Sequence, residues 1–245
     1  MTLFIAVLAA VTGGMNMDSL TAALHVETGM AFLEQGLTGR AMLEFDRALE
    51  RSDTAFEAYL GMGRALAAQG SWSSAEEHYL VYISHAPWDH RPLVELSGML
   101  LELSGRGDEA LELAEKALEL APLDGGCRLA RAQALEASGS YDDAMAAYLS
   151  VIAQNPECEM DARVKLGALL YSLGDIPEAR SVLLPAAGEN AEASRYLCLI
   201  YLEQGDMLRA ADSAARYLFM APDGYWADSA GQVMIEASFI PGAVE

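Results

Sequence analysis

The sequence predicts an all-α fold built from about six helix–turn–helix units of roughly 34 residues each. Three observations support this prediction. Glycines recur at a nearly constant spacing, an alanine follows each of them by five residues, and a small and then a large apolar residue precede each of them. With 53% hydrophobic residues in a chain of 245, a sizeable core can form and a disordered chain is excluded.

The recurring glycines, called here the ladder glycines, have spacings of 34, 35, 34, 35 and 31 residues. They are Gly36, Gly70, Gly105, Gly139, Gly174 and Gly205. We expect each to end the first helix of its unit, where a left-handed backbone is needed. The alanines five residues later allow a close helix–helix contact early in the second helix; they are Ala41, Ala75, Ala110, Ala144, Ala179 and Ala210.

Two further positions before each ladder glycine fit the same frame. Seven residues before it stand only small residues, which let two helices approach: Gly29, Gly63, Gly98, Ala132, Gly167 and Cys198. Four residues before it stand large apolar residues, which fill the groove beside the small ones: Phe32, Leu66, Leu101, Leu135, Leu170 and Tyr201. These positions predict tightly packed helix pairs.

Prolines mark the expected end of the second helix. They stand seventeen residues after a ladder glycine in four units, as Pro87, Pro122, Pro156 and Pro222. A residue before proline avoids the α conformation, so the helix should stop there. The fifth unit is shorter, lacks this proline and carries Pro185 within its second helix, which should kink or truncate that helix.

This pattern resembles the tetratricopeptide repeat (TPR), most closely in residues 98–122, GMLLELSGRGDEALELAEKALELAP. The resemblance covers residues 22–224 and implies a right-handed superhelical solenoid of about six TPR helix–turn–helix repeats. The expected units are 22–55, 56–90, 91–124, 125–159, 160–190 and 191–224. The resemblance specifies the fold closely but says little about the function.

Residues 225–245 are expected to form a C-terminal capping helix and a tail. One face of the helix is apolar and the other polar, as a terminal cap of a repeat array requires. The apolar face holds Trp226, Ala230, Val233 and Ala237, and the polar face holds Asp228, Ser229, Gln232 and Glu236.

An unbroken apolar run of nine residues occupies positions 3–11, within an N-terminal segment of residues 1–21. The run is too short to span a bilayer, so no transmembrane span is predicted. It matches the hydrophobic region of a cleaved signal peptide, although no Lys or Arg precedes it. Export is the favoured interpretation; a cytoplasmic protein with a packed N-terminal helix, or a misplaced start, is the alternative.

The chain is strongly acidic, with a net charge of -21. Such a chain repels nucleic-acid phosphates and anionic lipid headgroups, so neither is an expected partner. An apolar or basic peptide, or an amphipathic helix of another protein, fits better. The acidity could also serve solubility alone. The sequence leaves the oligomeric state open.

No motif for catalysis, a cofactor or a metal emerges, so the chain is not expected to be an enzyme. His85 and His90 flank a short Pro87–Asp89 linker without the spacing of a metal site. The three cysteines lack CxxC spacing, so we expect them to be small side chains that are buried or half-buried. A disulfide between Cys127 and Cys158 is conceivable, but nothing in the sequence supports it.

The resemblance implies that the first helix of each repeat lines a concave peptide-binding groove. By register, the groove residues that the sequence predicts include Met30, Arg64, Met99, Glu102, Gln133, Tyr171, Arg195 and Leu199. Val26 and Met30 stand where the TPR clamp for a peptide C-terminus would need polar residues, which argues against that clamp. The predicted function is a protein–protein interaction scaffold; the alternative is a structural or assembly subunit of a cell-envelope complex.

Overall fold

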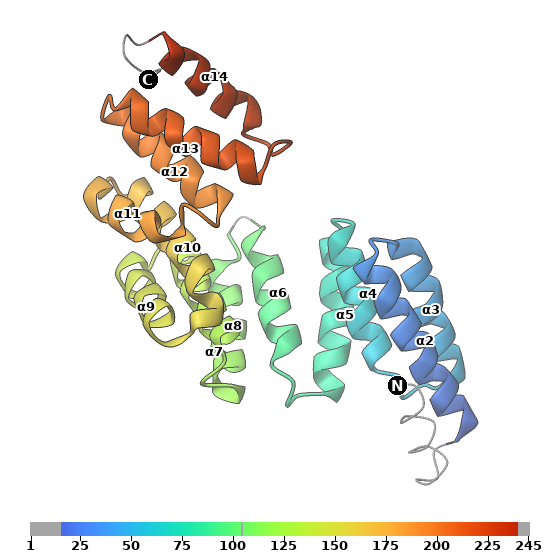
Figure 1. The fold of residues 1–245 in the computed structure, drawn as a ribbon. Helices are drawn as coiled ribbons and strands as arrows, with labels where there is room; N and C mark the ends of the chain where they lie inside the picture. The colour runs from blue at the N-terminus through green and yellow to red at the C-terminus, as the bar shows by residue number, and fades with distance from the viewer. Residues whose placement is uncertain (1–15, 104, 240–245) are drawn as a thin grey trace. The chain divides into compact units, whose positions relative to one another are not determined.

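The computed structural model describes residues 16–103 and 105–239 (Figure 1). These residues form thirteen α-helices and two short 3-10 helices, and they include no β-strand. The all-α helical repeat class predicted from the sequence is therefore confirmed. The apolar run at positions 3–11 and the end of the expected tail lie outside the described residues.

The chain divides into two compact units, Met1–Ser104 and Gly105–Glu245, a division that the repeat pattern did not predict. The described helices of the first unit are α2 (Met17–Glu34), α3 (Thr38–Arg51), α4 (Glu57–Ala68), α5 (Trp72–His85) and α6 (Arg91–Leu101). Helix α2 begins five residues before the expected start at position 22, because Asn16 caps it: the Asn16 side chain accepts the Asp18 backbone N–H at 2.5 Å. No described helix combines the length and the apolar character needed to cross a membrane.

The second unit continues the pairing of helices. Its helices are α7 (Gly107–Leu120), α8 (Gly125–Ala137), α9 (Tyr141–Gln154), α10 (Glu159–Ser172), α11 (Ile176–Leu183), α12 (Ala191–Glu203), α13 (Met207–Met220) and α14 (Ala227–Ser238). Helices α8 and α9, α10 and α11, and α12 and α13 lie side by side as pairs, as do α2 and α3, and α4 and α5, in the first unit (Figure 1). The limits of the six repeats remain a prediction.

All six ladder glycines have a left-handed backbone, with φ between 71° and 84°, and no other residue in the described part of the chain has a positive φ. Five of them follow the first helix of a contacting pair, as predicted, and Gly105 lies between α6 and α7, at the start of the second unit. After Gly139, for example, the Ser140 backbone N–H returns to the carbonyl oxygen of Leu135 at 2.9 Å, which satisfies a carbonyl that the helix end leaves open.

Prolines also act as the sequence predicts. Helices α5, α7, α9 and α13 each end two residues before a proline. The residue between helix and proline has left the helical conformation; Ala121, before Pro122, has φ -136° and ψ 74°. In the fifth pair, α11 has only eight residues and passes into a 3-10 turn, Leu184–Ala186, that contains Pro185. The expected truncation is confirmed.

Most of the small residues before the turn let the helices approach closely, but Gly98 is exposed and a Cβ there would meet nothing within 4 Å, so the prediction is wrong at that position. A Cβ on Gly29 of α2 would lie 2.5 Å from Cε1 of Phe45 on α3, and one on Gly167 of α10 would lie 2.5 Å from Cδ2 of Leu183 on α11. The six alanines that follow the ladder glycines are all fully buried. Glycine and alanine at these positions thus set the distance between paired helices.

Helix α14 packs on α13, as Figure 1 shows. Ala230, Val233 and Ala237 are buried against the repeats, and the predicted polar face is exposed. Trp226, just before the helix, meets the ring of Tyr217 edge-on at 5.2 Å between centroids. The predicted division into an apolar and a polar face is confirmed.

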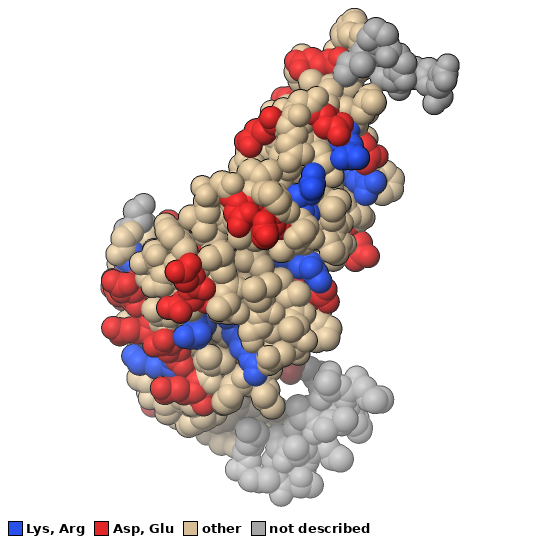
Figure 2. Space-filling model, turned by 90° about the vertical axis from the view of Figure 1, so that its left-hand side faces the viewer, with Lys and Arg blue, Asp and Glu red and all other residues tan. Residues whose placement is uncertain are grey.

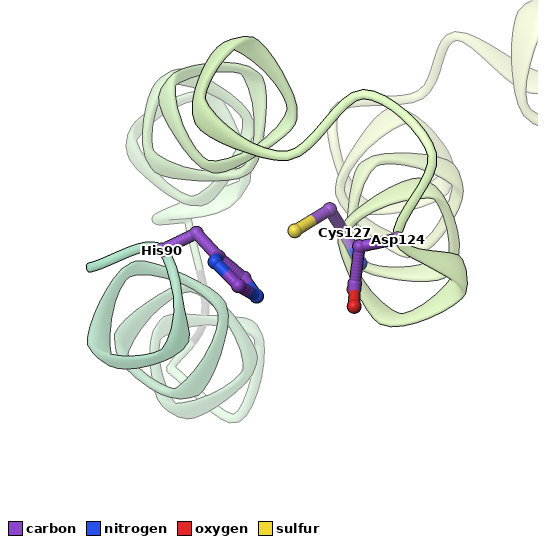
Figure 3. A group of neighbouring side chains, drawn as sticks. All are labelled: His90, Asp124 and Cys127. Carbon is purple, nitrogen blue, oxygen red and sulfur yellow. The ribbon is translucent and has the colours of Figure 1, made fainter. Parts of the chain in front are cut away.

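The cysteines are free thiols, Cys127 and Cys198 buried and Cys158 half-buried, as expected from their sequence context. At the start of α8, shown in Figure 3, the carboxylate of Asp124 accepts the backbone N–H of Cys127 at 2.9 Å. Burial raises the pKa of the Cys127 thiol to about 12, and Asp124 adds to the shift. The thiol is therefore protonated at neutral pH and serves packing.

Candidate functional site

Each unit carries an open hollow lined mainly by the first helices of its repeats. The first hollow, in the first unit, has a volume of about 400 Å³. Its wall is apolar, and its rim carries acidic and basic groups. It is lined by Val26, Met30, Leu33, Glu34, Glu57, Leu60, Arg64, Tyr82 and Arg91.

Arg64 of α4 enters the first hollow but is already paired. Its Nε donates to Oε2 of Glu95 at 2.8 Å, and its Nη2 forms a second bond to the same carboxylate. Tyr79 donates its hydroxyl to Glu95 at 3.1 Å, and Arg64 Nη1 lies 3.8 Å from the sulfur of Met30. Burial, then the Glu95 charge, raises the pKa of Tyr79. The two-bond pairing fixes the guanidinium against the hollow wall.

A second arginine of the first hollow is also paired. Arg91, at the start of α6, donates to the carboxylate of Asp89 through Nε at 2.9 Å and through Nη2 at 2.6 Å. The buried hydroxyl of Tyr82 donates to the same carboxylate at 3.0 Å. The bonds from Arg91, above all, lower the pKa of Asp89 to about 2. Asp89 thus anchors both the α5–α6 linker and one side of the hollow.

The second hollow, in the second unit, has a volume of about 320 Å³. It combines apolar groups from the first helices of three successive repeats with amides and charges. It is lined by Leu129, Gln133, Asp161, Val164, Lys165, Ala168, Asn190, Glu192 and Tyr196. Lys165 is one of only two lysines in the chain, and it is exposed here.

Beside the second hollow lies a cluster of aromatic rings around Arg195. The guanidinium carbon of Arg195 lies 4.1 Å from the ring centroid of Tyr196, and Tyr171 meets Tyr196 edge-on at 5.7 Å. Glu192 accepts from Arg195 Nε at 2.9 Å and from the Tyr225 hydroxyl at 3.0 Å. A bond to Glu203, together with burial, raises the pKa of Tyr171 to about 12.

The predicted groove residues are only partly brought together. Met30 and Arg64 share the first hollow, Gln133 lines the second, and Tyr171 and Arg195 meet through Tyr196 beside it. Three others line neither hollow. They are Met99, which is only 6% exposed, the exposed Glu102 and the half-buried Leu199.

Register reasoning missed several lining residues. Three of them, Glu57, Asp161 and Glu192, stand thirteen residues before a ladder glycine. This position is about one helical turn before the position of the predicted groove residue Arg195, which stands ten residues before Gly205, so both positions lie on one helix face. An acid at this place in three of the six units was a signal that could have found them. Tyr82 comes from a second helix, and no first-helix pattern could have indicated it.

Acidic residues outnumber basic ones in this chain, 36 to 15. On the face shown in Figure 2, acidic side chains spread over the surface, and basic ones stand beside several of them. Many ion pairs of the described residues join side chains two to four positions apart in the sequence, such as Arg163 with Glu159 and Arg216 with Asp212. Such exposed pairs contribute little stability, and the net charge of -21 remains available to attract cationic groups.

Comparison with known proteins agrees with the architecture. Family models of the tetratricopeptide repeat match residues 26–90, 101–160 and 137–200, which is more than half of the chain. No curated protein matches the chain at a significant level.

Several solved structures share the fold. A tetratricopeptide repeat protein from Parabacteroides merdae has a TM-score of 0.72 and 17% identity, with 95% of this chain and 91% of that chain covered. PilW, described as a type IV pilus biogenesis factor, has a TM-score of 0.73 and 15% identity, with 85% of this chain and 97% of that chain covered. PilF of Pseudomonas aeruginosa has a TM-score of 0.68 and 17% identity, with 89% of this chain and 99% of that chain covered. At these identities the likeness concerns the fold alone.

Helix pairs of about 34 residues, left-handed glycines at every turn and the family matches lead to one assignment. The chain belongs to the tetratricopeptide repeat family, whose members are in general non-catalytic scaffolds for protein–protein interaction.

Proposed function

We propose that this protein is a scaffold that binds a peptide segment or a helix of another protein along the first helices of its repeats. One observation carries the proposal. In each unit, first-helix residues of neighbouring repeats line one open hollow with an apolar wall and a charged rim. Such surfaces bind short segments by burying apolar side chains, and the charged rim selects among them.

The partner segment is expected to be apolar and basic. Val26, Leu33 and Leu60 offer an apolar wall in the first hollow, as Leu129 and Val164 do in the second. The acidity of the whole chain favours a cationic segment during approach and disfavours an acidic one.

Affinity purification from the native host would first identify the partner, and the purified pair would then be compared across variants. Leu33→Gln in the first hollow and Val164→Gln in the second should each weaken binding about tenfold or more, because each introduces an amide into a buried apolar contact.

Matched controls come from the second helices. Leu43 on α3 is 58% exposed and Leu149 on α9 is 54% exposed, and neither lines a hollow. Leu43→Gln and Leu149→Gln should leave binding unchanged. Equal losses from control and hollow variants, with circular dichroism showing all four folded, would argue against the proposed surface.

A second candidate function is an assembly subunit of a cell-envelope complex. It is favoured by the signal-like apolar run at positions 3–11. The similarity to PilF and PilW supports the fold in this candidate and nothing further. N-terminal sequencing of the mature protein from its host would test it: cleavage after the run supports the candidate, and an intact N-terminus in a cytosolic fraction removes its basis.

A further inference from the structure

We propose that the first hollow is a subsite for a Lys or Arg side chain of the partner segment, with Glu34 and Glu57 as its charge partners. This inference rests on the proposed function and adds the chemistry that the first unit selects. It concerns which charges of the hollow are available to a ligand.

The two arginines of the first hollow are not available to bind an acidic ligand. Glu95 holds the guanidinium of Arg64 with two hydrogen bonds, and Asp89 holds that of Arg91 in the same way. Tyr79 and Tyr82 each add a hydroxyl bond to one of these carboxylates. Both arginines are therefore neutralised within the protein, and an acidic ligand would have to displace those carboxylates.

Two carboxylates of the first hollow, in contrast, are exposed and have no charge partner in the described part of the chain. Glu34, the last residue of α2, and Glu57, the first of α4, are both exposed. Neither side-chain carboxylate has a hydrogen bond or an ion pair with a residue in the ranges 16–103 and 105–239. The uncompensated charge of the hollow is thus negative, contributed by two groups from successive repeats.

The position of Glu34 adds an independent argument. The C-terminal end of a helix carries a partial negative charge, so a carboxylate there is unfavourable. The last turn of α2 contains no basic residue to offset it. The charge of Glu34 is therefore unfavourable to its own helix, and a cationic group of a ligand beside it would offset that charge.

The wall of the hollow suits the rest of a basic side chain. Val26, Met30, Leu33 and Leu60 provide the apolar surface, and Leu60 itself is buried. The aliphatic stem of a Lys or Arg can lie on such a wall while its charged end reaches a carboxylate at the rim. An aliphatic neighbour in the partner would cover the remaining apolar surface.

The test uses a random peptide library displayed on phage and selected against the full-length protein. We expect the selected peptides to share a Lys or Arg next to an aliphatic residue. In a selection against Glu34→Gln/Glu57→Gln this preference should disappear. For one selected peptide, measured by fluorescence anisotropy, each single change should weaken affinity about three- to tenfold, and the effect should shrink at high salt.

Glu50→Gln provides a matched control. Glu50 is an exposed acid near the C-terminal end of α3 and lines no hollow; unlike α2, α3 carries a basic residue, Arg51, in its last turn. The control should bind the selected peptide as the wild type does. Thermal unfolding should show Glu34→Gln as stable as the wild type or more so, which separates lost binding from lost folding.

The outcomes distinguish this inference from the proposed function. Peptides selected without any basic preference, or a basic preference that survives in the double variant, would overturn the inference and leave the scaffold function intact. A library that gives no binding peptide at all would overturn both.

Discussion

The ring of Phe45 occupies the space that a side chain at Gly29 would need. A Cβ on Gly29 would lie 2.5 Å from Cε1 of Phe45, and a Cβ on Gly61 would also collide with the same ring. Phe45 is fully buried, so the ring is held between a glycine of α2 and a glycine of α4. One aromatic residue thus couples the first pair of helices to the second.

We expect Gly29→Ala to lower the free energy of unfolding by about 1–3 kcal/mol, because the ring has no room to shift. The control is Gly231→Ala in the interior of α14, where a Cβ meets nothing within 4 Å; it should raise the free energy by about 0.5–1 kcal/mol through helix propensity. Urea unfolding measures both. A stabilising Gly29→Ala would show that Phe45 does not restrict this site.

The ladder glycines should be needed for their backbone conformation alone. Gly139 has φ 82°, and a Cβ there would meet nothing within 4 Å. Gly139→Ala should therefore cost about 1–2 kcal/mol through the left-handed backbone. Gly139→Asn should cost less, since asparagine adopts this conformation more readily. Equal losses in chemical denaturation would contradict this explanation.

Asp89 should give stability a dependence on pH. Its pKa in the folded protein is about 2, below the ordinary value of 3.8, mainly through the bonds from Arg91. A lowered folded-state pKa stabilises the protein above pH 3.8, and this contribution is lost as pH falls through about 2. Because Arg91 is 63% exposed, we expect about 1–2 kcal/mol at most.

The measurement compares wild type with Asp89→Asn by urea unfolding between pH 5 and about 2.5. The difference in unfolding free energy should be largest at the upper end and shrink toward the lower end. Tyr82→Phe should retain most of this pH dependence, because Arg91 is the main cause. A difference independent of pH would assign the loss to packing instead.

The contact between Trp226 and Tyr217 should stabilise the C-terminal helix. The ring of Trp226 lies edge-on to Tyr217, and its backbone N–H donates to the Tyr217 hydroxyl at 3.1 Å. Trp226→Ala should cost about 2 kcal/mol, less than for a fully buried Trp. Trp226→Phe keeps an aromatic ring and should cost under about 1 kcal/mol. Identical losses in thermal unfolding would show that the ring contact is unimportant.

Much of the fold follows from the sequence because single backbone positions determine it. A glycine at φ near 80° or a proline after a helix has one main structural solution, so Gly139 and Pro122 mark their boundaries directly. The early start of α2 at Met17 was missed because it depends on a capping bond from Asn16 that apolar spacing does not reveal.

The candidate site could be predicted from the sequence less well than the fold. Register placed Met30, Arg64 and Gln133 at the hollows, but it could not show that Arg64 is neutralised by Glu95, thirty-one positions away. Nor could it place Tyr82, which reaches the first hollow from a second helix. Such features depend on which side chains of different helices meet, and a repeat pattern carries no information about pairs.

The central claim, binding along the first helices, is tested most directly by site-specific photo-crosslinking in the native host. A photoreactive amino acid at Val26 or Val164, both in hollows, should crosslink to one and the same partner protein. The same residue at Leu43 or Leu149, exposed on second helices, should not. Crosslinking to that partner from Leu43 and Leu149, with none from Val26 and Val164, would contradict the claim.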